Sequence, residues 1–185
     1  MDQNVLEQLL DYVRSRYFGK YRAVVTDNAD PTSRGRLQVR VPAVLGDLAV
    51  WAMPCVPYAG DGVGFYSLPA SGAGVWIEFE GGDPSYPIWV GCFWADGQLP
   101  DASDANIKIW KTASLTLRMD DSSDEWLAEA SSGSRVTVSS EVKSESSGAT
   151  HTVGSAGVTS DGGGAGKVEV TASSVRINNG ALEVT

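Results

Sequence analysis

The sequence predicts an all-β protein with one short helix at its N-terminus. Two runs of alternating apolar residues flank a turn-forming stretch at 81–84, which predicts a β-hairpin with one apolar face. These runs are Val75, Ile77 and Phe79 before the turn and Ile88, Val90 and Cys92 after it. Beyond residue 106, short pairs of alternating apolar residues recur to the end of the chain and predict a long series of strands.

The helix is predicted over residues 4–18, where apolar residues recur every three to four positions. Asn4 and Glu7 suit its first turn, and Gly19 suits its end. Two packings stay open for the apolar stripe. It can pack on the domain that follows in the same chain, or dock on a partner protein or on sister chains.

The composition excludes several classes of function. A chain of 185 residues with 42% hydrophobic content has room for one ordinary domain plus an appendage. A net charge of −9 offers no basic stripe to a phosphate backbone, so nucleic acid is not an expected partner. Residues 1–18 do not resemble a signal peptide, and no apolar run approaches the roughly 20 residues of a membrane span.

The two cysteines, Cys55 and Cys92, stand in apolar, strand-like runs. This setting predicts two buried free thiols in a protein that is assembled in a reducing cytoplasm, with a disulfide as the less favoured alternative.

Two strands are predicted upstream of the hairpin, over 21–25 and 36–41. In the second, apolar residues alternate with arginines, so the arginines are expected to face outward. Arg34, Arg36 and Arg40 are therefore candidates for docking an acidic partner. A solvated basic strand face explains the same pattern.

Three ordered blocks carry a family resemblance. They are 30–42, 51–60 and 76–94, the last beginning Trp-Ile-Glu-Phe-Glu-Gly-Gly-Asp-Pro. Together they resemble the oligonucleotide/oligosaccharide-binding (OB) barrel of the baseplate assembly protein V and VgrG family, the central spike proteins of contractile phage tails and injection systems. The resemblance implies an N-terminal helix at 1–18, an OB barrel at 19–100, a joint at 101–106, and an intertwined trimeric β-helical needle at 107–185.

The segment 107–185 is not expected to fold alone. Ordering a five-residue strand costs roughly 5–10 kcal/mol of backbone entropy, whereas burying two valines returns about 3–6 kcal/mol. Three chains winding together would give each strand a ladder partner and the valines a common axial core. A disordered linker is the alternative interpretation. Between 139 and 166 the pattern is too irregular to predict a shape.

No catalytic, cofactor or metal site is predicted. His151 is the only histidine and lies in a Ser/Thr/Gly-rich stretch, where we expect it on the outer surface of the needle. Some spikes of the family bind iron near the apex through a His-x-His motif, but here His151-Thr152-Val153 lacks the second histidine. Glu78, Glu80 and Asp83 are interpreted as a solvated strand edge rather than the carboxylate pair of a cell-wall hydrolase.

The resemblance and the tail together predict a non-enzymatic homotrimeric spike. Its barrels would seat on the hub of the tail tube, and its needle would pierce the target envelope. The chain stops in mid-strand, so we expect the end, Leu182, Glu183, Val184 and Thr185, to bind a PAAR-type tip protein. Assembly is expected in the bacterial cytoplasm, within a phage tail or an injection particle. The alternative is an OB module that binds a glycan or nucleic acid and carries a flexible tail.

Overall fold

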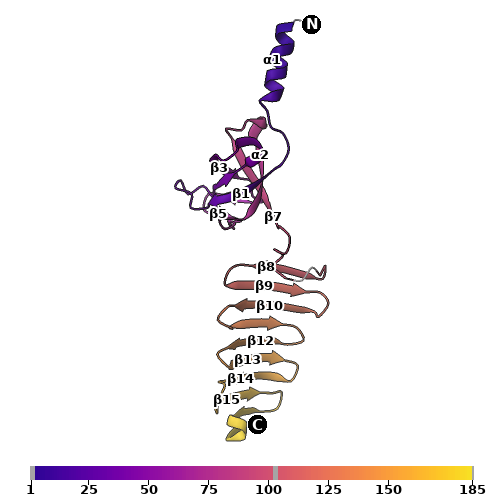
Figure 1. Ribbon diagram of the computed structural model, residues 1–185. Helices are drawn as coiled ribbons and strands as arrows, with labels where there is room; N and C mark the ends of the chain where they lie inside the picture. Colours follow the sequence, from indigo (N-terminus) through magenta and orange to yellow (C-terminus); the bar gives the residue numbers. More distant parts are fainter. Residues whose placement is uncertain (1–2, 102–103, 185) are drawn as a thin grey trace. The chain divides into compact units, whose positions relative to one another are not determined.

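The computed structural model describes residues 3–101 and 104–184. The chain divides into two compact units, one up to residue 98 and one from residue 99 onward (Figure 1). Among the described residues, no helix has both the length and the apolar character needed to cross a membrane.

The first unit contains a closed five-stranded barrel with the strand order β1-β2-β3-β7-β6. Its strands are β1 (Tyr21–Asp27), β2 (Leu37–Arg40), β3 (Ala49–Pro54), β6 (Gly74–Phe79) and β7 (Pro87–Phe93). Pairing of β1 with β6 closes the barrel, and β3 with β7 is its one parallel pair. A short helix, α2 (Pro42–Leu45), links β2 to β3, and a small hairpin, β4 (Ala59–Gly60) and β5 (Val63–Gly64), precedes β6. A single turn of 3-10 helix, η1 (Glu80–Gly82), links β6 to β7. This arrangement is an OB-like barrel, as predicted.

The barrel core confirms the alternation seen in the sequence. Inward-facing residues of every strand pack together and are at most 6% exposed, while their neighbours along each strand face outward. The core residues are Ala23, Val25, Leu37, Val39, Val41, Ala52, Val75, Ile77, Phe79 and Trp89. The barrel thus folds around a core of its own.

Strand β7 shows how alternation alone can mislead. Its two buried residues are Pro87 and Trp89, whereas Ile88 and Val90 of the predicted apolar set are only partly buried. Pro87 pairs with Phe79 and Trp89 with Ile77, so these residues share the inner face. A bulge then shifts the register, because Trp76 pairs with Gly91. Both alternating sets of β7 are apolar, and the register decides between them.

The prediction of two buried cysteines is wrong. Cys55 and Cys92 are both free and both exposed. Cys55 lies just past the end of β3, and Cys92 lies next to the last residue of β7, opposite Val75 in the ladder.

The N-terminal helix, α1 (Gln3–Arg14), ends four residues before the predicted boundary. The segment after it packs on the barrel instead: the backbone N–H of Tyr17 donates to the carbonyl of Gly82 at 2.8 Å, and Arg16 pairs with Asp83 at 3.0 Å. No residue of α1 is buried, and its large apolar side chains are at least 42% exposed. Of the two packings left open by the sequence, burial of the stripe on the chain's own barrel is not the one observed.

The second unit is a single antiparallel sheet of ten strands, β8 to β17, in sequence order (Figure 1). The strands are β8 (Ile107–Lys111), β9 (Leu115–Asp120), β10 (Glu125–Ala130), β11 (Arg135–Val138), β12 (Val142–Ser146), β13 (Ala149–Gly154), β14 (Gly157–Asp161), β15 (Lys167–Val170), β16 (Val175–Ile177) and β17 (Leu182–Val184). A turn of 3-10 helix, η2 (Asn178–Gly180), separates the last two strands. The predicted series of strands is confirmed, and the segment is not a disordered linker.

Each strand of this sheet finds its ladder partners within the chain, whereas the sequence analysis expected them from sister chains. Tight turns explain the difference. Ser147 and Gly148 form a two-residue turn between β12 and β13, and both have positive φ, as the primed hairpin turns require. Such turns fold each strand back onto its predecessor before any other chain is needed.

Candidate functional site

The ten-stranded sheet has one strongly apolar face. Residues that pair directly across neighbouring strands share a face, so the register can be followed from strand to strand. One unbroken row of such pairs runs from β9 to β17 and contains only large apolar side chains. The row is Met119, Trp126, Val138, Val142, Val153, Val158, Val170, Val175 and Val184.

A second row lies beside the first on the same face. It is Trp110, Leu117, Ala128, Val136, Ser144, His151, Ser160, Val168, Ile177 and Leu182. We call the two rows, together with Leu115, the apolar face. Four residues from the alternating apolar pairs beyond residue 106 all point to this face: Val136, Val168, Ile177 and Leu182.

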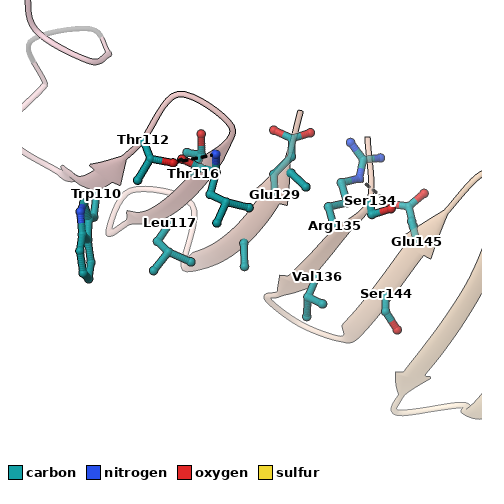
Figure 2. A pocket seen from close by; sticks show the side chains of 13 residues that line it. Trp110, Thr112, Thr116, Leu117, Glu129, Ser134, Arg135, Val136, Ser144 and Glu145 are labelled. Carbon is teal, nitrogen blue, oxygen red and sulfur yellow. Dashed lines mark hydrogen bonds and ion pairs between the residues drawn. The ribbon is translucent and has the colours of Figure 1, made fainter. Parts of the chain in front are cut away.

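The opposite face is polar over most of its length. Arg135 pairs with Glu145 at 2.7 Å across β11 and β12, and Lys167 pairs with Glu169 at 2.6 Å along β15. Ile107, Ile109 and Leu127 are apolar exceptions near the β8 end. Figure 2 shows the division: Trp110, Leu117, Val136 and Ser144 point to one side of the sheet, and Glu129 and Arg135 to the other.

Within one chain, nothing described in the second unit covers the apolar face. Fourteen of its large side chains are between 36% and 62% exposed, from Trp110 to Val184. In the described part of the second unit only Ser174 is buried, whereas the barrel has ten buried apolar residues. Exposed apolar areas of this extent mark interaction surfaces in soluble proteins. The described part of the second unit thus has no apolar core of its own.

His151 is exposed in the single chain, as expected, and the register places it on the apolar face, between Ser144 of β12 and Ser160 of β14. Its Nδ1 lies 2.7 Å from the hydroxyl of Ser160. Serine, threonine and glycine hide the strand boundaries at 139–166, so the face on which His151 lies could not be predicted from the sequence.

The three candidate arginines do not form one surface. Arg36 is engaged within the barrel: its guanidinium donates to the Asp30 carboxylate from Nη2 at 2.7 Å and from Nε at 3.0 Å. It also lies over the ring of Trp51, with the guanidinium carbon 5.2 Å from the ring centroid. Arg36 lies beside the inward-facing Leu37 on the outer side of the barrel, as expected, but Asp30 and Trp51 engage it, so its side chain is only partly exposed. Arg34 and Arg40 are exposed.

Asp30 was not singled out in the sequence, yet it organises the loop before β2. Its carboxylate, only 3% exposed, also accepts hydrogen bonds from the backbone N–H groups of Thr32, Arg34 and Arg36. The hydrogen bonds from the Arg36 side chain, followed by those of the backbone, hold the pKa of Asp30 well below its usual range. The sequence signal was an Asp four to six residues before arginines in a turn-rich stretch.

The three carboxylates interpreted as a solvated strand edge, Glu78, Glu80 and Asp83, have separate surroundings. Glu78 forms an ion pair with Lys20, Asp83 pairs with Arg16, and Glu80 begins the turn of 3-10 helix after β6. Within the described ranges, no group of three or more His, Cys, Asp or Glu side chains is placed to hold a metal ion.

The strand β17 pairs with β16 and is the last strand of the sheet among the described residues. Leu182 and Val184 are exposed on the apolar face. Glu183 lies opposite Arg176 in the ladder. Thr185, the last of the predicted tip-binding residues, lies outside the described residues.

The fold defines the class of protein: an OB-like barrel followed by a one-layer sheet whose apolar face nothing in the described part of the second unit covers. Residues 21–94 match the family described as the type VI secretion system/phage-baseplate injector OB domain. The barrel is therefore an injector OB domain of this family, which is a structural component of phage baseplates and injection particles. A comparison with curated proteins finds no significant match.

Proposed function

We propose that the chain is a non-enzymatic spike subunit of a baseplate, and that three copies assemble with their apolar faces turned inward. One observation carries the proposal: the sheet exposes two rows of large apolar side chains, whereas its opposite face carries ion pairs. Burying apolar area contributes roughly 25 cal/mol per Å², so three such faces gain the core that one chain lacks. The barrel's membership of an injector family supports the same role.

Three copies fit the shape of the apolar face. The face is only about two side chains wide but continues over nine strands. Three long, narrow faces can close a prism around a common axis, with the ion-paired faces in solvent. The resulting rod concentrates the thrust of a contracting tail on a small area of the target envelope.

The solution mass of the full chain tests this proposal. We expect a particle of three chains, rich in β-structure by circular dichroism and resistant to protease throughout the sheet. A monomer with a protease-sensitive segment after residue 106 would contradict the spike and favour the alternative, an OB module that binds a glycan or nucleic acid.

We also propose that the exposed Arg34 and Arg40 contact an acidic surface of the hub. Their exposure and their position around β2 of the injector barrel support this assignment, whereas Arg36 is engaged by Asp30. Charge reversal of both residues, Arg34→Glu with Arg40→Glu, is expected to weaken capture of the purified hub by about tenfold or more at low salt. Lys111→Glu, a charge reversal in the sheet, serves as the matched control. Equal hub capture by all three proteins would contradict the assignment.

For the tip, we propose that β17 and the end of the apolar face bind a separate PAAR-type protein. The exposed Leu182 and Val184, which lie on the apolar face in β17, support this. Truncation after Asn179 removes β17, so it should abolish co-purification of the tip protein while the trimer persists. Retention of the tip protein by the truncated trimer would refute the assignment.

A further inference from the structure

The helix α1 carries a continuous band of apolar side chains along one side. All of them are between 42% and 59% exposed: Val5, Leu6, Leu9, Leu10, Tyr12 and Val13. In a heptad frame with Leu6 at position a, Leu9 takes position d and Val13 takes the next a. The other three apolar residues fill the flanking positions e and g, whereas the charged residues of the helix fall at b and f, on the opposite side. The apolar side of α1 is therefore free of charge.

A helix of this length needs a packing partner. It has 12 residues, and isolated helices shorter than about 12–15 residues are only marginally stable in water. The barrel of the same chain is not that partner, because no residue of α1 is buried. Only after the helix has ended does a side chain of this segment, that of Tyr17, pack against the barrel core. The apolar side of α1 is thus left to another chain.

The end of α1 is tied to the barrel. The guanidinium carbon of Arg16 lies 5.1 Å from the centroid of the Tyr12 ring, in the last turn of the helix, and its Nη1 lies 3.0 Å from the carboxylate of Asp83. The next residue, Tyr17, donates its backbone N–H to the carbonyl of Gly82. Copies related by a threefold axis therefore carry their α1 helices from equivalent points of their barrels, and the helices run in the same direction along the axis.

We propose that the α1 helices of three chains pack in parallel as a three-helix bundle with Leu6, Leu9 and Val13 in its core. The inference rests on the proposed threefold assembly and adds a second interface, separate from the apolar face of the sheet. The width of the apolar side favours three copies. A helix of a two-stranded coiled coil buries mainly positions a and d, whereas a helix of a bundle contacts two neighbours and buries flanking positions as well. Because this side carries no charge, identical helices meet on it without like-charge repulsion.

Disulfide trapping tests the bundle in the full chain, purified without other baseplate proteins. The exposed natural cysteines are first replaced, by Cys55→Ser and Cys92→Ser. Leu9→Cys then places one thiol per chain in the proposed core, and Asp11→Cys places it at the outward position f as the matched control. A disulfide requires Cα atoms within about 7 Å of each other. On mild oxidation, Leu9→Cys trimers should give covalent two-chain species in denaturing gels, whereas Asp11→Cys trimers should give single chains.

A charge substitution gives a second readout that needs no thiol. Leu9→Asp places a carboxylate from each chain in the proposed core, so we expect protease to cut within residues 3–14 at least about tenfold faster than in the wild type. The trimer itself should persist, because the sheet still holds it. Gln8→Asp adds the same charge at the outward position c and should leave the rate of cleavage unchanged.

The outcomes separate the bundle from the proposed function. Trimers in which Leu9→Cys gives no more cross-linking than Asp11→Cys, or in which Leu9→Asp and Gln8→Asp are cut equally fast, would overturn the bundle and leave the spike intact. A monomeric chain would overturn both.

Discussion

Replacing Val153 by Asp is expected to prevent assembly of the sheet. Val153 lies in the unbroken first row of the apolar face, between Val142 and Val158. In the proposed trimer its three copies are buried, and each substituted carboxylate would lose its hydration without gaining a partner. An uncompensated buried charge costs several kcal/mol, so three copies exceed the stability of an ordinary domain. We expect a monomer by solution mass and rapid proteolysis after residue 106.

The neighbouring residue provides the matched control. Thr152 precedes Val153 in β13 but lies on the opposite face, where it pairs with Lys143 and Thr159. Thr152→Asp introduces the same charge one position away, beside a lysine, and we expect a protease-resistant trimer of unchanged mass. If both variants were trimeric, the apolar face would not be the interface.

Replacing Asp30 by Asn is expected to destabilise the barrel. The carboxylate accepts three backbone hydrogen bonds and holds the Arg36 side chain, and the uncharged amide cannot satisfy this set of donors. We expect the melting temperature of the barrel to fall by roughly 5–10 °C at neutral pH, measured by calorimetry. Asp47→Asn changes an exposed carboxylate and should leave the melting temperature unchanged.

The pH dependence of stability gives a second readout of Asp30. Its pKa is lowered on folding from the unfolded value of about 3.9, so the folded state binds the proton more weakly than the unfolded state. The contribution is complete above that value and is lost as the pH falls towards the folded pKa. The wild-type barrel should therefore lose more stability between about pH 5 and pH 2 than Asp30→Asn. Parallel pH profiles would show that the carboxylate does not stabilise the fold.

The sequence predicts the barrel well because its strands are buried on one face. In β1, β2 and β6 the inward residues are apolar and their outward neighbours are polar, apart from Val24 and Trp76, so a period of two identifies both strand and face. In β7 both sets of residues are apolar, and only the pairing of Trp89 with Ile77 decides which set is inside.

The sheet is predicted in part. The apolar pairs at 136 and 138, and those from 168 onward, identify strands, but between 139 and 166 Ser, Thr and Gly hide the boundaries. The turn at Ser147 and Gly148 sets the register there, and that register places His151 among the valines. The ion pair of Arg36 was missed for a different reason: its partner Asp30 lies six residues away in a loop, and an ion pair across a turn leaves no periodic signal.

The neighbour-to-neighbour pairing of β8 to β17 also has a kinetic consequence. Every ladder contact joins segments that are close in sequence, so the sheet has a low contact order. Its hairpins can therefore form one after another. The barrel, with its own core, can form during synthesis, whereas in the proposed trimer the apolar face of the sheet is covered only when other copies arrive. Maturation of the rod should accordingly accelerate with chain concentration, and linking three barrels through one scaffold should speed it further by raising the effective concentration of the tails.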